Sequence, residues 1–336
     1  MARQPTIRDV AERAGVSHQT VSRVINGHEL VSSTTRERVK RAIEELHYVP
    51  SPIARGLMSN RTHSIGLVSS AISDHFFGEV AAGAEIEARR RGYYLVIASV
   101  EEHAEADERA YLRLMLERRV EGLIVARPRL PISVDQLPLD HVPIVAIASA
   151  DAPGVTVVDV DNRSGGRDAV GYLLQRGHRR IATVTGPMEW RSSQHRLEGY
   201  RDALSTAGVA FDPSLTEQAH GWEPADGQAA MARLLMRGAS FTALFTYSDM
   251  IGIGAIKELR TRGLRVPQDV SVVGYDDVPV AAYVDPPLTT IRQPMREVGE
   301  HAASLVLDAI AHGGQGANRL LPAQLIVRDS VIAPPG

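Results

Sequence analysis

Residues 6–27 read TIRDVAERAGVSHQTVSRVING, which is the pattern of two short helices joined by a tight turn. Thr6 and Asp9 are spaced as a capping box for the first helix, and Gly15 would end that helix. Ser17 is a candidate N-cap for the second helix. Apolar residues recur at helical spacing in both segments, so each helix is predicted to bury one face.

A third helix is predicted directly downstream. Thr34 and Glu37 form another possible capping box, and Val39, Ala42 and Leu46 would cover the first two helices. Three short helices with a glycine-containing turn between the first two are typical of a helix-turn-helix unit, whose second helix enters the major groove of DNA. Residues 1–50 are therefore predicted to form an all-α helix-turn-helix DNA-binding headpiece.

The charge distribution supports this interpretation. Residues 1–62 contain ten Lys or Arg against six Asp or Glu, a net charge of +4, whereas the rest of the chain contains 27 against 34, a net charge of -7. Only the N-terminal segment has the sign that phosphate binding requires. In the second helix, polar side chains lie off the apolar face, and Gln19 and Arg23 could read base edges. They could equally be ordinary solvated helix residues.

Residues 51–62 are predicted to be a hinge and linker. Ser51-Pro52 is a helix start, and a short helix over residues 53–58 would follow. Isolated helices of this length are marginal in water, and Gly56 weakens this one further. The segment is therefore expected to order only on DNA or a partner.

From residue 63 to 336, short apolar runs alternate with helical patterns. Alternation of this kind predicts parallel, doubly wound α/β sheets, and its restart after Asp159 predicts two interleaved subdomains around a cleft. The apolar runs predicted as strands are 65–68, 94–97, 122–125, 144–147, 181–184, 243–246 and 270–273. The helical patterns are 77–91, 106–117, 165–175, 195–206, 226–236 and 250–260.

Ligands of such sheets bind beyond the carboxyl ends of the strands. Sugar sites combine planar aromatic rings with Asp, Gln and Arg, and Trp190, Trp222, Arg196, Asp276 and Gln293 follow predicted strands or lie near them. Structural roles are the alternative: Asp249 could be only an N-cap, Asp276 could stabilise its turn, and either Trp could be core. Adjacent Asp276 and Asp277 are expected to point in different directions, which argues against a catalytic carboxylate pair.

The chain resembles the lactose/galactose repressor (LacI/GalR) family over the whole headpiece, where it is close to the lactose repressor. The resemblance lies in residues 6–11, 14–17, 20–27, 48–50 and 54–57, and in the core most sharply in 273–277 and 287–293. It implies a periplasmic-binding-protein-like core and a hinge residue, Leu57, that enters the minor groove. The DNA-contacting positions it implies are Thr6, Ser17, His18, Gln19, Thr20, Ser22, Arg23, Asn26, Ser32, Ala54 and Leu57. The effector-contacting positions expected from it and from the strand ends are Phe76, Trp190, Ser192, Arg196, Trp222, Ser248, Asp249, Asp276 and Gln293.

The function expected from these features is repression of transcription. A homodimer would bind a palindromic operator in double-stranded DNA and be released by a small sugar effector, a β-galactoside or a cellobiose-like disaccharide. A nucleobase- or other metabolite-responsive repressor, in which the ligand acts as corepressor, is the alternative. No leucine heptads follow Arg328, so a tetramer of the lactose repressor's kind is not expected.

Several other classes of protein are not expected. The chain has no cysteine, its histidines lack metal-ligand spacing, and no nucleophile–base set is recognisable, so we expect no catalytic residue, metal or cofactor. No segment reaches the roughly 18 consecutive apolar residues of a membrane span. A sugar-transport protein would need a secretion signal where this chain has a basic headpiece. A cytoplasmic location is expected.

Overall fold

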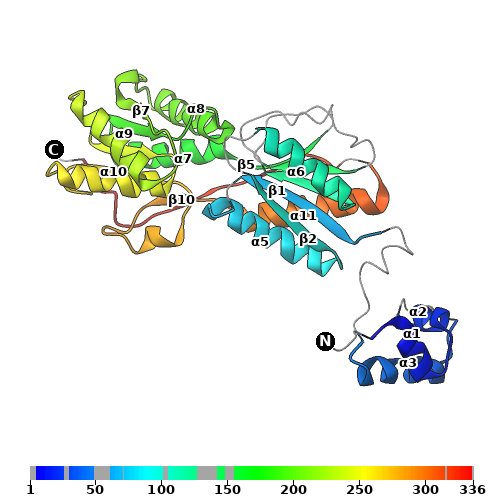
Figure 1. Cartoon of the computed structure of the whole chain (residues 1–336). Coiled ribbons are helices and arrows are strands. Elements are labelled where there is room, and N and C mark those ends of the chain that lie inside the picture. Colours follow the sequence, from blue (N-terminus) through cyan, green and yellow to red (C-terminus); the bar gives the residue numbers. More distant parts are fainter. Residues whose placement is uncertain are drawn as a thin grey trace. The chain divides into compact units, whose positions relative to one another are not determined.

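The structure is a computed structural model that describes residues 5–25, 30–48, 61–70, 72–100, 105–126, 142–147, 155–314 and 316–334 (Figure 1). The chain divides into two compact units, Met1–His63 and Ser64–Gly336. Among the described helices, none combines the length and the apolar character needed to cross a membrane.

The first unit contains α1 (Ile7–Ala14), α2 (His18–Ile25) and α3 (Ser33–Glu45). The capping box at α1 is confirmed: the Thr6 amide donates to Asp9 Oδ2 at 2.6 Å, and the Asp9 amide donates to Thr6 Oγ1 at 3.4 Å. Gly15 ends α1 in the left-handed conformation, with φ +63°, where a side chain would be strained. The local sequence signals therefore set both ends of this helix.

The predicted start of the third helix is wrong by two residues. Ser32, in extended conformation, is the N-cap, and its Oγ accepts a hydrogen bond from the Thr35 amide at 3.3 Å. Thr34 already lies inside α3. The hydroxyl of Ser32 lies opposite the amide of Thr35, the third residue of α3. The cap is therefore Ser32, the residue just before the helix, and not Thr34.

A small core holds the three helices together. Val10, Val21 and Val39, one from each helix, are completely buried. The Arg38 guanidinium on α3 also donates to the carbonyl of Ala14 at 2.5 Å, across the carboxyl end of α1. The apolar face of α2 is therefore held against α1 and α3, and its polar face is directed outward.

In the second unit, six described strands form a parallel sheet in the order β11-β5-β4-β3-β1-β2. Its strands and the helices that pack with it are β1 (Ser64–Ser70), α5 (His75–Arg90), β2 (Tyr94–Val100), α6 (Glu105–Glu117), β3 (Gly122–Ala126), β4 (Ile144–Ile147), β5 (Thr156–Val160), α11 (Met295–His312) and β11 (Arg319–Leu321). The carboxyl-terminal part of the chain thus returns to the first sheet, where α11 packs along α5 (Figure 1).

Four further strands form a second parallel sheet, in the order β7-β6-β8-β9. Its elements are α7 (Asn162–Gln175), β6 (Ile181–Thr185), α8 (Arg191–Thr206), β7 (Thr216–Gln218), α9 (Pro224–Met236), β8 (Ala243–Thr246), α10 (Asp249–Thr261) and β9 (Ser271–Val273). Two short strands, β10 (Thr290–Arg292) and β12 (Gln324–Ile326), pair antiparallel. The predicted doubly wound architecture of two interleaved subdomains is confirmed.

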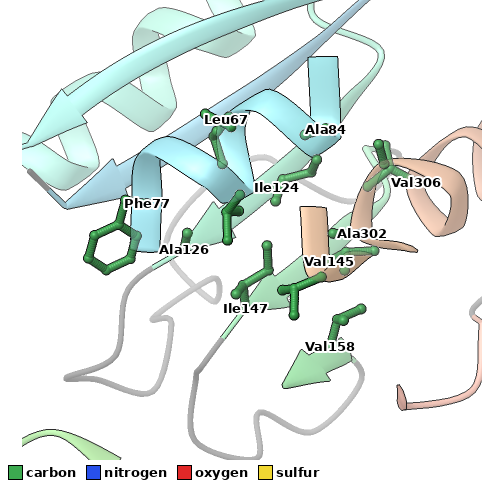
Figure 2. Packing of buried hydrophobic residues seen from close by; sticks show 14 of the residues in the cluster. Leu67, Phe77, Ala84, Ile124, Ala126, Val145, Ile147, Val158, Ala302 and Val306 are labelled. Atoms are coloured by element: carbon green, nitrogen blue, oxygen red, sulfur yellow. The ribbon is translucent and has the colours of Figure 1, made fainter. Parts of the chain in front are cut away.

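The core of the first subdomain reaches toward the second one. Figure 2 shows Leu67, Ile124 and Val145 between the strands and the helices α5 and α11. Phe77, at the beginning of α5, belongs to the same cluster and lies with its ring centroid 6.3 Å from that of Trp190, which precedes α8 of the second subdomain. The hydrophobic core therefore fixes one wall of the space between the subdomains.

Candidate ligand pocket and nucleic-acid interface

A cavity of about 410 Å³ lies at the carboxyl ends of strands from both sheets. This volume is within the range of small-molecule sites. Eight of the nine predicted effector residues line it: Phe76, Trp190, Ser192, Arg196, Trp222, Ser248, Asp276 and Gln293. Residues more than 200 positions apart in the sequence thus meet in one place, as parallel-sheet topology requires.

Asp249 is the exception, because the structure does not place it among the described residues of the cavity wall. Its carboxylate lies behind the wall, where Oδ1 accepts from the Thr290 hydroxyl at 2.5 Å and Oδ2 accepts from the Val278 amide at 2.9 Å. Nor is Asp249 the N-cap of α10, a role that Ser248 takes by accepting from the Ile251 amide. Asp249 anchors the loop that follows Asp276, and its burial beside Asp276 raises its pKa well above the usual value.

Aromatic rings form one side of the cavity. The rings of Phe76 and Phe77 meet edge to face at 5.2 Å, and those of Trp190 and Trp222 do so at 5.1 Å. Trp222 reaches this position because residue 186 is glycine: a Cβ there would lie 2.3 Å from Cη2 of the indole. An apolar ring surface of this kind can cover the apolar face of a sugar or a planar base.

Arg196 is the buried cation of the site, with 5% of its side chain exposed. Its Nε donates to Asn162 Oδ1 at 2.9 Å, Nη1 donates to the Tyr247 carbonyl, and the guanidinium lies 3.7 Å from the centre of the Tyr275 ring. Nη1 is also 3.9 Å from Asp276 Oδ1. These contacts hold the guanidinium in one orientation before any ligand arrives.

Asp276 and Asp277 point in different directions, as expected. Asp276 faces the cavity and accepts from Gln293 Nε2 at 2.6 Å, whereas Asp277 pairs with Arg292 at 2.6 Å and Arg328 at 2.5 Å. Both residues have positive φ, +110° and +56°, which turns the chain sharply between them. Burial raises the pKa of Asp276 to about 7, and Arg196 opposes this shift.

Several wall residues were missed by sequence reasoning. Asp159 and Asn162 come from β5 and the start of α7, and Glu223 is the N-cap of α9. Asp159 lies within β5, whose β-branched residues 155–158 would have indicated a strand had they been recognised as one. Asp74 and His75 also line the wall, next to the predicted Phe76.

The predicted DNA-contacting residues in the first unit lie on the surface of the helices. Ser17, His18, Gln19, Arg23 and Ser32 are exposed. Thr6, Thr20 and Ser22 are half-buried. Ser17 Oγ accepts from the Thr20 amide at 3.1 Å, so this serine also caps α2. Asn26, Ala54 and Leu57 lie outside the described residues.

Comparison with known proteins agrees with both parts of the chain. The family described as "Bacterial regulatory proteins, lacI family" matches residues 6–51, and a periplasmic binding protein-like domain matches residues 170–331. The repressor CytR of Escherichia coli is 35% identical over 98% of this chain and 97% of its own. The regulator CelR of Thermobifida fusca is 38% identical over 98% of both chains.

Solved structures show the same relationship. The lac repressor dimer bound to operator and an anti-inducer has a TM-score of 0.91 at 31% identity, covering 98% of this chain and 100% of that one. The complex of CelR with cellobiose has a TM-score of 0.75 at 37% identity, covering 97% and 100%. With its helix-turn-helix unit, its two-subdomain core and these relatives, the chain belongs to the lacI family of bacterial regulatory proteins.

Proposed function

We propose that this protein is a transcriptional repressor that binds operator DNA as a homodimer and is released by a small sugar bound in the cavity. Residues 1–50 would read the major groove, residues 51–62 would form the hinge with Leu57 as its minor-groove wedge, and residues 63–336 would bind the effector and dimerise. The observation that carries the proposal is the cavity between the subdomains, where Arg196 and Asp276 face a wall of aromatic rings. Work on DNA would place the protein in the cytoplasm.

The chemistry of the wall favours an uncharged saccharide. Hydroxyl groups can donate to Asp276 and accept from Arg196, while Trp190 and Trp222 offer ring surface to the apolar face of a pyranose. The relatives support this class: one of the structural neighbours is a complex with cellobiose, and another is the lac repressor. A β-galactoside or a cellobiose-like disaccharide is the proposed effector.

A nucleobase is the second candidate. The repressor PurR of Klebsiella pneumoniae is 38% identical over 97% of this chain, and the aromatic rings of the wall would also offer a surface to a planar base. Such a ligand would act as corepressor and tighten DNA binding, the opposite of the sugar response.

The position of the cavity explains how a ligand could change DNA binding. Phe76 comes from the first subdomain, and Arg196 and Trp222 come from the second, so a ligand touches both at once. It can shift the arrangement of the subdomains only by the difference between its affinities for the two arrangements. An inducing sugar would favour the arrangement in which the two hinges of the dimer are apart.

Thermal unfolding of the full chain with cellobiose, lactose, galactose, maltose, ribose and purines tests the effector class, because a ligand that binds only the folded state raises its stability. The sugar that raises the unfolding temperature should then release the protein from a duplex selected from random DNA, which should contain two inverted half-sites. Stabilisation by a purine alone, with tighter DNA binding, would establish the corepressor instead.

Arg196→Ala checks the pocket within the same assay. The variant should bind the selected duplex but show no sugar-dependent shift or release. Arg201→Ala is the matched control, since Arg201 is exposed on the same helix and lies outside the cavity wall. A normal sugar response in Arg196→Ala would contradict the assignment of this cavity.

A further inference from the structure

Asp159 occupies an unusual place in the cavity wall. It lies on β5, where Thr156, Val157, Val158 and Val160 are buried, and it faces the cavity. Its Oδ1 accepts a hydrogen bond from the adjacent Val160 amide at 2.7 Å. Burial raises the pKa of Asp159 to about 6, against the opposing effect of Arg191 and Arg196, so the carboxylate is ionised at pH 8.

Acidic side chains outnumber arginines among the described residues of the cavity wall. The described wall carries four acidic side chains, Asp74, Asp159, Glu223 and Asp276, and one arginine, Arg196. Arg196 already donates to Asn162 and to a backbone carbonyl, and it faces Asp276 at 3.9 Å. Among the described residues, none forms an ion pair with Asp159: the positive charges of Arg191 and Arg196 favour its ionised form without direct contact with the carboxylate.

A purely structural role explains this carboxylate poorly. A valine or threonine at position 159 would continue the buried run of β5 and would avoid the cost of removing a charge from water. The one hydrogen bond from Val160 offsets only part of that cost, because a carboxylate can accept about four. The remaining acceptor positions are available to a molecule in the cavity.

We propose that Asp159 is a specificity-determining residue: its carboxylate accepts hydrogen bonds from hydroxyl groups of an uncharged sugar and excludes sugars that carry a phosphate or a carboxylate. This inference rests on the proposed function and deepens it. A neutral polyol supplies donors for Asp159 at no electrostatic cost, whereas an anionic sugar would meet repulsion in a region of low dielectric constant.

Calorimetric titration of the full chain at pH 8 tests the inference. The probes are cellobiose and lactose, each compared with its 6-phosphate, and the proteins are wild type, Asp159→Asn and Asp168→Asn. Asp168 is an exposed carboxylate on α7 outside the cavity wall, so it serves as the matched control. For the neutral sugar that binds wild type, affinity should fall about tenfold or more in Asp159→Asn, the effect of losing a hydrogen bond to a charged group.

The 6-phosphate of that sugar provides the second readout. It should bind wild type far more weakly than the neutral sugar, and the difference should shrink in Asp159→Asn but not in Asp168→Asn. Asp159→Glu, which keeps the charge, should still exclude the phosphate, and this separates loss of charge from a damaged fold. Unliganded unfolding temperature and DNA binding report folding for every variant.

Two outcomes are distinguishable. If wild type and Asp159→Asn bind the neutral sugar and its phosphate with the same ratio of affinities, Asp159 does not determine specificity, although the sugar-responsive function stands. If wild type binds neither neutral disaccharide and is stabilised only by a purine, the proposed function fails and this inference fails with it.

Discussion

The two units of this protein place their candidate functional residues in opposite environments. In the headpiece, Gln19 and Arg23 are exposed on one helix and belong to a single short stretch of sequence. In the cavity, Arg196 and Gln293 are buried, come from separate segments and depend on hydrogen bonds to other wall residues. A surface that reads DNA needs only a rigid support, whereas a pocket must assemble and satisfy its own polar groups.

The two units also differ in the size of their hydrophobic cores. The headpiece has a core of a few small residues, and small cores give marginal stability. The second unit has several larger hydrophobic clusters, which can offset polar groups that burial destabilises. We therefore expect single substitutions to damage the headpiece without damaging the second unit, and some substitutions in the cavity to improve stability at the expense of ligand binding.

The largest expected effect is loss of the headpiece fold alone. Val39 is completely buried, and Val39→Asn removes apolar contacts and buries an amide, at a cost of about 3 kcal/mol or more. Hydrogen-exchange mass spectrometry of the full chain should show rapid exchange in α1–α3 and unchanged protection from β1 onward. Glu44→Asn, on the exposed face of α3, should leave both regions protected. Increased exchange in both units would show that their folding is coupled.

A smaller effect should separate the adjacent carboxylates Asp276 and Asp277. Because the folded-state pKa of Asp276 is raised to about 7 from 3.8, the folded protein binds more protons than the unfolded chain between these values. Wild-type stability therefore decreases as pH rises through this window and levels off above it. The positive charge of Arg196 lowers the pKa of Asp276, and the negative charge of Asp74 raises it. Asp276 in turn raises the pKa of the neighbouring Asp249.

Asp276→Asn cannot titrate, so its free energy of unfolding, relative to wild type, should rise from pH 4 to pH 7 by an amount on the order of a few kcal/mol. Its sugar affinity should fall.

Asp277→Asn should instead destabilise the protein by about 2 kcal/mol or more at neutral pH, since Arg292 and Arg328 lose their shared partner. Urea unfolding at several pH values measures both, and effects of the same sign in the two variants would contradict the assignment.

The smallest expected effect concerns the beginning of α3. Ser32→Ala removes the cap that binds the Thr35 amide and should cost the headpiece about 1 kcal/mol. Thr34→Ala, at the position where the sequence suggested a cap, should change stability by less than about 0.5 kcal/mol. Exchange rates of amides in the first turn of α3 measure this directly. Equal effects from the two substitutions would favour the capping box expected from sequence.

A region could be predicted well where its structure depends on residues that are close together in the sequence. The headpiece depends on caps and spacing within a few residues, so α1 and α2 were predicted closely, whereas the cap of α3 was expected at Thr34 and lies at Ser32. Long apolar runs also identified β1, β3 and β8. These signals come from apolar residues that are neighbours in the chain, so a single sequence contains them.

Some of the missed elements, such as β11, pair with residues far away in the sequence. β11 lies beside β5 although about 160 residues separate them, and its three residues carry no distinctive pattern. Long-range contacts also explain why the position of Asp249 was not predicted. A carboxylate that follows a strand can face the cavity or lie behind its wall. Asp249 lies behind the wall because it accepts hydrogen bonds from Val278 and Thr290, which are distant in the sequence. No periodicity records such long-range contacts.

The aromatic wall has a practical consequence. Trp190 and Trp222 are the only tryptophans of the chain, and both line the cavity. Their indole emission should therefore respond to occupancy of the pocket, while the headpiece contributes nothing to it. The protein carries its own optical reporter of effector binding, which can be followed without a label while the headpiece is engaged on DNA.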